Sequence, residues 1–343
     1  MAAERIMATF KREDRHEFRY LLAIRIADAL SWVIWLIPGP LRYWIADRVG
    51  DIFRSMTHTY RDNVESNVSQ VVQQPAQGEE VQNASRNIFR LSSRNFVDLM
   101  TIPRLSRKGL VSLLTLKNGG WEPLDEALNE GRGVIMVAAH LGPFDTIGQI
   151  IKARGYKLTI VTGRTTSRFI FDGVTHLRGS RGVQLVEPTP SGVRKAIKAI
   201  HNKEIAVFVC DRDFFQNGRE VDFFGRPTTL PPGAIRIARD TGALILPIMT
   251  SREGTKYQAA FLPTFTIPKT SDLESDMRAG MEKLVEVLEE GIRPRVDQWV
   301  MFQRVWPDVP PPAIRVFPVG SPLESELLEK VAQALPERRR PDH

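Results

Sequence analysis

A histidine and an aspartate five residues further along provide the first candidate for chemistry in this chain. Both lie in the stretch GVIMVAAHLGPFDTIG, as His140 and Asp145. The apolar run 134–137 is typical of a strand buried on both faces, and Pro143 suits the start of a helix that would carry Asp145. Open α/β sheets bind ligands at the carboxyl ends of their strands, so both side chains would face one crevice. The spacing therefore predicts an acid/base pair.

A second cluster of polar and aromatic side chains spans residues 211–233, with the sequence DRDFFQNGREVDFFGRPTTLPPG. It begins where the apolar run 205–209 ends, which is again the carboxyl end of an expected strand. Its carboxylates, arginines and phenylalanines predict a pocket with one polar and one apolar wall. A charged hairpin at the protein surface is the alternative interpretation.

Several well-known catalytic motifs are missing from the sequence. It contains no G-x-S-x-G, no Walker A loop, no G-x-G-x-x-G and no H-E-x-x-H. His140 and Asp145 are too few to bind a metal alone, and neither His176 nor His201 has an obvious ligand spacing. We expect the single cysteine, Cys210, to be a buried thiol, because it follows the apolar run IAVFV. No metal and no cofactor are expected.

Composition narrows the class of protein further. The chain has 343 residues, of which 42% are hydrophobic and 25% charged, so it can bury a substantial core. Its net charge of +7 suits an anionic partner, such as nucleic acid, a phospholipid surface or a phosphorylated ligand. Nucleic acid is the least favoured of these, because the basic residues are dispersed and accompany no recognised motif. A single cysteine is compatible with the cytoplasm, and no secretory signal is apparent.

The amino-terminal region contains the most apolar early segment, Tyr20 to Ile37. Arg25 and Asp28 interrupt it and Pro38 ends it, so it falls short of a membrane-spanning helix. Apolar residues recur at helical spacing here and again over 41–53, which predicts two amphipathic helices. Their aromatic rings and nearby arginines favour a membrane interface. A helix pair packed on a catalytic domain is the alternative. The rings are those of Trp32, Trp35, Tyr43 and Trp44.

The rest of the chain predicts an α/β fold: a mixed, mostly parallel sheet flanked by helices. Helices are expected over 63–72, 80–100 and 273–290. Strands are expected over 111–116, 134–138, 158–161, 183–186, 205–209 and 244–248, with helices near 123–129, 146–154, 168–179, 191–202 and 232–241 between them. We divide the chain into a helical membrane-associating region (1–106), an α/β acyltransferase domain (107–320), named for the resemblance below, and a C-terminal helix with a charged tail (321–343).

Four segments together resemble the bacterial lysophospholipid acyltransferase family, which comprises lipid A late acyltransferases and phosphatidylinositol mannoside acyltransferases. The segments are AAHLGPFD, DRDFFQNGREVDFFGRPTTLPPG, ARDTGALILP and QWVMFQRVWP, and their order and spacing match over roughly residues 20 to 307. Asp145 in place of a glutamate, and GREVDFFG after DRD, resemble the mannoside branch. Pro143 and Phe144 stand where many members have Asn-Trp, which would alter the floor of the pocket.

The resemblance implies a membrane-associated O-acyltransferase on the cytoplasmic face of the cell membrane. Such an enzyme moves a fatty acyl chain from acyl-CoA or acyl-carrier protein to a hydroxyl of a glycolipid or lysophospholipid. The sequence leaves open which thioester is the donor and which lipid is the acceptor.

The candidate residues fit that chemistry. Acyl transfer to an alcohol needs a base with a pKa near about 7, which histidine provides. His140 would take the hydroxyl proton and return it to the departing thiolate, and Asp145 or Glu220 would fix its tautomer. Backbone amides at the helix start after Gly142 would stabilise the oxyanion. Arginines match phosphate oxygens, and phenylalanines suit an acyl groove. The binding candidates are Arg164, Arg178, Arg212, Phe223 and Phe224.

Two other functions remain open at this point. A non-catalytic lipid-binding protein on the same scaffold would tolerate loss of His140. A metal-dependent hydrolase would instead use His140 and Asp145 as ligands and would be sensitive to chelators.

Overall fold

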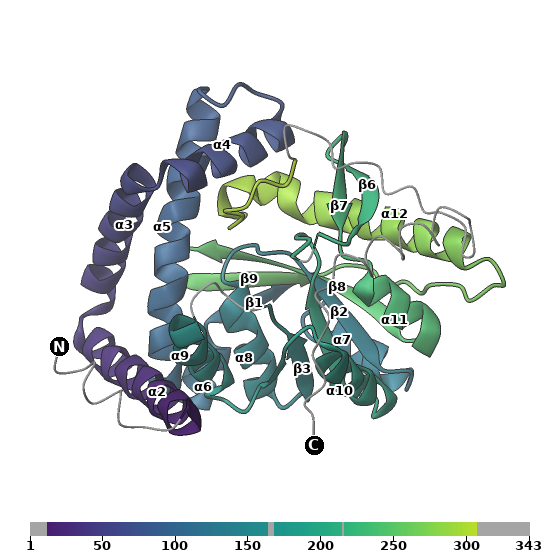
Figure 1. The fold of residues 1–343 in the computed structure, drawn as a ribbon, viewed down its shortest axis with the longest axis horizontal. Coiled ribbons are helices and arrows are strands. Elements are labelled where there is room, and N and C mark those ends of the chain that lie inside the picture. Colours follow the sequence, from purple (N-terminus) through teal and green to yellow (C-terminus); the bar gives the residue numbers. More distant parts are fainter. Residues whose placement is uncertain (1–11, 164–167, 215, 307–343) are drawn as a thin grey trace, which may run out of the picture. The chain divides into compact units, whose positions relative to one another are not determined.

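A seven-stranded sheet lies at the centre of the computed structural model, which describes residues 12–163, 168–214 and 216–306 (Figure 1). The strand order is β1-β9-β8-β2-β5-β3-β4; only β8 and β9 pair antiparallel, and every other pair is parallel. A separate antiparallel hairpin consists of β6 and β7. The strands are β1 Leu114–Lys117, β2 Val134–Ala138, β3 Leu158–Val161, β4 Gln184–Val186, β5 Ile205–Val209, β6 Arg219–Phe223, β7 Arg226–Leu230, β8 Leu244–Glu253 and β9 Lys256–Phe261. The predicted mixed, mostly parallel α/β sheet is confirmed.

Strand β2 is fully buried because helices cover both faces of the sheet. Its side chains alternate between two hydrophobic cores, as the two-residue period of a strand requires. Val134 and Met136 belong to the core that α6, α7 and α8 cover, whereas Ile135 and Val137 belong to the core that α10, α11 and α12 cover. The helices from α4 onward, including those named above, have the following bounds. They are α4 His58–Val72, α5 Glu79–Thr101, η1 Ile102–Arg104, α6 Arg107–Val111, α7 Glu122–Asn129, α8 Phe144–Arg154, α9 Arg168–Gly179, α10 Pro190–His201, α11 Gly233–Thr241, α12 Leu273–Ile292 and η2 Arg293–Gln298.

The predicted element boundaries hold best where the apolar pattern is strongest. Strands β2, β3 and β5 and helix α9 have the expected bounds. The strand expected over 111–116 is wrong at its start, because residues 107–111 form α6, which Ser106 caps by accepting a hydrogen bond from the Gly109 amide at 3.0 Å. Strand β9 was not predicted. The expected C-terminal segment 321–343 lies outside the described residues.

Helices α2 (Arg12–Leu36) and α3 (Gly39–Met56) follow one another along the outside of α5 (Figure 1). Their inward side chains are small: Ala23, Ala27 and Ser31 on α2 and Ala46 and Gly50 on α3 are buried. A Cβ atom on Gly50 would lie 2.7 Å from the Cα of Arg90, so α3 and α5 pack backbone to backbone here. None of the described helices is both long and apolar enough to cross a membrane.

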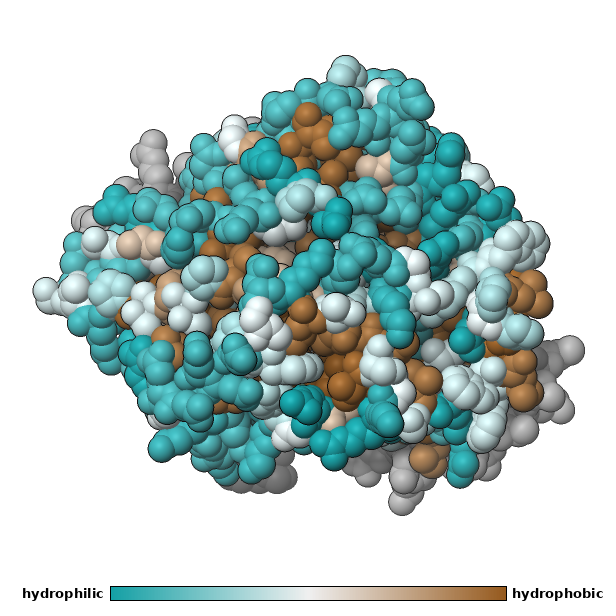
Figure 2. Space-filling view, turned by 180° about the vertical axis from the view of Figure 1, so that it is seen from behind, coloured by the Kyte–Doolittle hydropathy of each residue, from teal (hydrophilic) through white to brown (hydrophobic). Residues whose placement is uncertain are grey.

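Most of the large apolar side chains of these two helices point outward and form what we call the α2–α3 surface. Leu36 is 77% exposed, Trp44 58% and Ile52 57%. Hydrophobic residues are visible along the right-hand edge of Figure 2, the edge on which α2 and α3 lie in that view. A surface helix of a soluble protein turns its large apolar residues towards the core and its polar residues outward. Helices α2 and α3 show the reverse arrangement, with small residues inward and large apolar residues outward. The α2–α3 surface comprises Tyr20, Leu21, Leu22, Ile26, Leu30, Trp32, Val33, Leu36, Leu41, Trp44, Ile45, Val49, Ile52 and Met56.

Candidate active site

His140 follows the carboxyl end of β2, and Asp211 follows the carboxyl end of the neighbouring strand β5. The two strands pair in parallel with Ala138 opposite Val209, so the residues after them meet at one edge of the sheet. The Nδ1 atom of His140 lies 2.7 Å from Oδ1 of Asp211, and the His140 amide donates to Oδ2 at 2.8 Å. The sequence predicts Asp145 or Glu220 as the acid that binds the His140 imidazole. In the structure that acid is Asp211.

Asp211 is fully buried and receives a third donor from the Trp299 indole, whose Nε1 lies 2.7 Å from Oδ2. Burial raises the pKa of the Asp211 carboxyl, but the charge of His140 and the donated hydrogen bonds outweigh burial and hold that pKa below its ordinary value. An ionised carboxylate only accepts hydrogen bonds, so Nδ1 of His140 donates to it, and in the neutral form of the imidazole the lone pair is then on Nε2. The imidazole is 23% exposed and is available to accept a proton at Nε2.

Asp145 forms an ion pair with Arg178, and Nη2 of the arginine lies 2.7 Å from Oδ1 of the carboxylate. Asp145 is in the first turn of α8 and Arg178 is in the last turn of α9. Both side chains are largely buried, at 18% and 20% exposure, and Arg178 Nη1 also donates to Thr162 Oγ1 at 3.4 Å. The structure therefore brings two predicted site residues together, with Asp145 oriented towards the guanidinium.

The turn between β2 and α8 has most of its backbone groups bound. The Gly142 amide donates to Gln298 O at 3.0 Å, and the His140 carbonyl accepts from the Val300 amide at 2.7 Å. Gly142 has a φ of 57°, and a Cβ atom there would lie 2.7 Å from the Cα of Ser251, so only glycine fits. The Gly142 amide is therefore occupied. The amides that begin α8, those of Phe144 and Asp145, have no partner within their own helix and are the candidates for an oxyanion site.

The other predicted binding residues lie in different surroundings. Arg164 lies outside the described residues. Arg212 is half-buried with its Cζ atom 5.1 Å from the Phe214 ring centroid, and burial lowers the pKa of its guanidinium. Within the described part of the chain it forms no ion pair. Glu220 is exposed on the β6–β7 hairpin and makes no contact with His140 there.

Phe223 and Phe224 pack into an aromatic cluster rather than lining open space. Their side chains are 0% and 4% exposed, and both rings contact Trp299 and Trp306. Trp299 also donates to Asp211, so the cluster supports the carboxylate that orients His140. A role of the two phenylalanines in holding an acyl chain stays a prediction. Sequence reasoning assigned no role to Trp299, although it lies in the QWVMFQRVWP segment.

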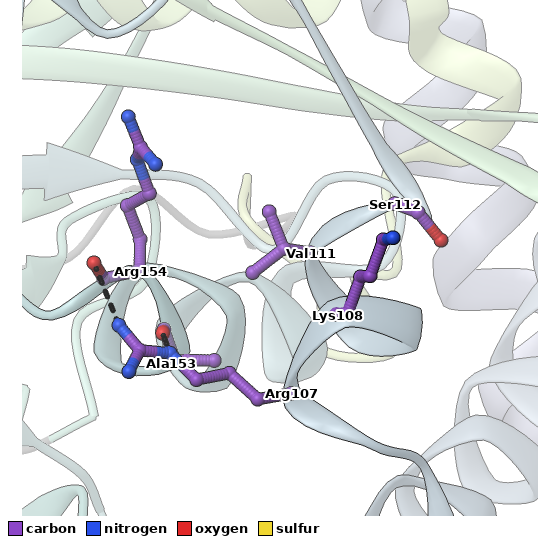
Figure 3. Close-up of a pocket in the computed structure, with 6 residues that line it drawn as sticks. All are labelled: Arg107, Lys108, Val111, Ser112, Ala153 and Arg154. Carbon is purple, nitrogen blue, oxygen red and sulfur yellow. Dashed lines mark hydrogen bonds between the residues drawn. The ribbon is translucent and has the colours of Figure 1, made fainter.

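A cavity of about 470 Å³ lies far from this site (Figure 3). It adjoins Ala153 and Arg154 at the end of α8, whereas Asp145 is at the start, and an 11-residue helix is roughly 16 Å long. Arg107 donates to the Ala153 and Arg154 carbonyls. Its positive charge therefore compensates the negative end of the α8 dipole, and the cavity needs no ligand to explain its basic character. Its lining residues are Arg107, Lys108, Val111, Ser112, Ala153 and Arg154.

Within residues 12–163, 168–214 and 216–306, no group of three His, Cys, Asp or Glu side chains is arranged to hold a metal ion. The metal-dependent alternative therefore gains no support from the described side chains. Cys210 is buried, as expected, and burial raises the pKa of its thiol. It is not poised as a nucleophile.

Comparisons with known proteins identify the family of this chain. A phosphatidylinositol mannoside acyltransferase of Mycobacterium tuberculosis (strain ATCC 25618 / H37Rv) is 26% identical over 217 residues, which cover 62% of this chain and 67% of that protein. A lipid A biosynthesis acyltransferase of Haemophilus influenzae is 24% identical over 194 residues, which cover 53% of this chain and 56% of that protein. The family model described as bacterial lipid A biosynthesis acyltransferase matches residues 7–307. The chain therefore belongs to the bacterial lipid A biosynthesis acyltransferase family.

Proposed function

We propose that this protein transfers a fatty acyl chain from an acyl thioester to a hydroxyl group of a glycolipid or lysophospholipid at a membrane surface. Membership of an acyltransferase family supports the reaction class. The observation that carries the mechanism is the His140–Asp211 pair, which leaves Nε2 of the imidazole free to take a proton. Relatives named for phosphatidylinositol mannoside or lipid A make a phosphorylated glycolipid our preferred acceptor.

The reaction runs in two steps. Nε2 of His140 removes the proton of the acceptor hydroxyl while the oxygen attacks the thioester carbonyl carbon, which forms the new C–O bond. Asp211 stabilises the imidazolium, as an acid does in a Ser-His-Asp triad. The tetrahedral intermediate then collapses, the C–S bond breaks, and the thiolate takes the proton from His140. Because the acceptor supplies the oxygen nucleophile, no acyl-enzyme forms.

Two positive groups are available to the negative charges of this reaction. The amides of Phe144 and Asp145 begin α8 and would donate to the oxyanion, where the helix dipole also favours negative charge. Arg178 is held by Asp145 at the same helix start and would bind an oxyanion or a phosphate. We propose Asp145 as the residue that orients Arg178. Arg164 and Arg212 stay candidates for the phosphorylated end of a substrate.

The α2–α3 surface supports attachment to a membrane. An apolar face this extensive marks an interaction site in a soluble protein. Tryptophans favour the lipid headgroup zone, and the exposed face offers Trp32 and Trp44, which are 53% and 58% exposed. Arg48, whose side chain is 51% exposed, would contact anionic lipid. We propose that α2 and α3 lie in the interface at the cytoplasmic face of the cell membrane.

The end of α3 is joined to the site through an aromatic contact. The ring of Phe53 on α3 lies 5.8 Å from the ring of Phe302. Phe302 is two residues beyond Val300, whose amide binds the His140 carbonyl. These contacts join α3 to the segment that binds the His140 turn.

The experiment that tests this function measures thiol release from a long-chain acyl-CoA, and from acyl-carrier protein, with lipid-extract vesicles present. Acylated lipids are identified by mass spectrometry. We expect lipid-dependent release, a product heavier by one acyl group, and loss of both in His140→Ala. His201→Ala is the matched control, because His201 is exposed at the end of α10, and it should retain wild-type activity.

Two results would contradict the proposal. Full activity in His140→Ala would remove the histidine mechanism. Vesicle binding without transfer from either thioester would instead favour the non-catalytic lipid-binding protein.

A further inference from the structure

A buried polar network connects α3 to the turn that carries His140. It begins at Tyr43, which lies on α3 but points inward, unlike Trp44 beside it. The Tyr43 hydroxyl donates to Oδ1 of Asp98 on α5 at 2.6 Å. Asp98 is 1% exposed, and its other oxygen forms an ion pair with Arg252 on β8, which is 6% exposed. The Arg252 guanidinium also lies 5.4 Å from the Tyr43 ring centroid.

The second half of the network reaches the turn itself. Gln298 makes two hydrogen bonds with the backbone of Arg252: its Oε1 accepts at 2.8 Å and its Nε2 donates at 3.1 Å. The carbonyl of the same Gln298 accepts the Gly142 amide at 3.0 Å. On the other side of the turn, Asn95 of α5 donates to the Gly142 carbonyl at 2.8 Å. Both peptide groups of Gly142 are therefore held by residues that belong to, or adjoin, this network.

A network of this kind has a cost that apolar packing would avoid. Burying a carboxylate and a guanidinium is costly even when they pair, and an apolar substitute is often equally stable. The pair does, however, fix the relative positions of α5 and β8 more narrowly than apolar side chains would. Gly142 lies between these two elements, since its Cα region abuts Ser251 of β8 and its carbonyl accepts a hydrogen bond from Asn95 of α5.

We propose that Tyr43 and Asp98 are positioning residues for the His140 turn and link the α2–α3 surface to it. Asp98 fixes Arg252, Arg252 fixes Gln298, and Gln298 fixes the Gly142 amide two residues beyond His140. Tyr43 ties this chain of contacts to α3. The position of α3 on a lipid surface then affects where the turn holds His140 and the α8 amides. The kinetic part of this inference rests on the proposed acyl transfer.

The variant that tests the inference is Tyr43→Phe, which keeps the ring and removes only the hydroxyl. Tyr156→Phe is the matched control, because Tyr156 also donates to an aspartate, Asp125, at 2.7 Å but lies away from the turn. The first measurement is hydrogen exchange of residues 139–146. We expect exchange there about tenfold to hundredfold faster in Tyr43→Phe, as loss of one hydrogen bond to a charged group implies, and unchanged in Tyr156→Phe.

The second measurement is steady-state kinetics on vesicles. We expect kcat to fall about threefold to tenfold in Tyr43→Phe, with KM for the thioester unchanged, because the turn is misplaced while the donor site is intact. Unchanged exchange in residues 139–146 would overturn the inference. Equal acceleration throughout the protein would also overturn it, since that result indicates a purely structural role.

The exchange measurement also separates the two proposals. If the wild-type protein transfers no acyl group to any lipid, the proposed function fails, yet exchange still decides whether Tyr43 holds the turn. If transfer occurs and exchange is unaffected, the function stands and the network is structural only.

Discussion

The edge of the sheet at His140 and the α2–α3 surface both differ from an ordinary soluble protein. The first buries charged side chains, and the second exposes apolar ones. The sheet edge buries charge: Asp211 is fully buried and Asp98 is 1% exposed. The α2–α3 surface exposes apolar side chains such as Leu36 and Trp44. The protein compensates the first departure itself, with three donors on Asp211 and an ion pair on Asp98. Nothing among the described residues covers the second.

The difference separates buried charges, which the chain pairs by itself, from exposed apolar side chains, which no described part of the chain covers. A buried carboxylate without partners is costly, and the three donors on Asp211 offset that cost. An apolar surface costs little folding stability and lowers solubility instead. The side chains around His140 are therefore held in place by the chain itself, whereas we propose that lipid covers the α2–α3 surface.

The largest effect is expected from Asp211→Asn. The amide cannot act as an anionic acceptor, so it leaves His140 without the group that fixes its tautomer and stabilises the imidazolium. We expect kcat to fall by about 10³-fold to 10⁴-fold, as for the equivalent change in a Ser-His-Asp triad. The measurement is thiol release under saturating thioester. Asp222→Asn, an exposed acid on β6, is the control and should behave as wild type. Retention of more than about a tenth of the activity by Asp211→Asn would contradict the proposed role.

An intermediate effect is expected from Trp44→Ser and Ile52→Ser on the α2–α3 surface. Both side chains are more than half exposed, so the free energy of unfolding should change by less than about 0.5 kcal/mol. Binding to anionic vesicles should weaken by about tenfold for each substitution, because each removes apolar area that would enter the interface. Vesicle sedimentation measures the binding. Leu273→Ser, which changes an exposed leucine on α12, is the control and should bind normally. Equal weakening in that control would mean that the loss of vesicle binding is not specific to the α2–α3 surface.

The smallest effect is expected from an acid at the surface. Asp51 accepts hydrogen bonds from Arg90, and this contact holds the pKa of its carboxyl below the ordinary value. A lowered carboxyl pKa stabilises the fold above the unfolded pKa of about 3.9, and the contribution is lost as pH falls through the folded pKa. Asp51→Asn should therefore reduce the free energy of unfolding at pH 7 by at most about 1 kcal/mol, and by less in high salt.

Urea unfolding at pH 7 and at about pH 3 measures this loss in the free energy of unfolding. The difference between wild type and Asp51→Asn should shrink towards the acidic end. The pKa of Asp211 is lowered as well, so its contribution has the same sign and the same acidic window. A difference for Asp51→Asn that is equal at both pH values would show that the surface charge pair contributes nothing.

The sequence predicts the sheet edge well but not the contacts across it. Strand β2 is evident because a strand covered on both faces is apolar throughout, and His140 then follows at its end. Strand β9, KYQAAF, is less evident, because its buried and partly buried residues do not form an apolar run. Asp211 was recognised as part of a polar cluster, but its contact with His140 joins residues 71 apart, and no local pattern contains that information.

The same limit applies to the residues that were assigned a role by spacing. The H-x₄-D pattern predicts that His140 and Asp145 lie near one crevice. It cannot show that Asp145 forms an ion pair with Arg178. Phe223 and Phe224 are apolar and adjacent to carboxylates, which suggested a groove wall. Only the three-dimensional arrangement shows that Trp299 and Trp306 enclose them. Aromatic residues in the core and at a ligand site have the same sequence signature.

Helix α2 has an unusual place in the order of synthesis. It leaves the ribosome before all of its partners, since Ser31 binds the Met100 carbonyl 69 residues later and Asp28 binds His176 148 residues later. Its inward residues are small, so it gains little apolar burial from either neighbour. Helix α2, which begins the part of the chain that the structure describes, can therefore take up its place only after α5 and α9 have been synthesised.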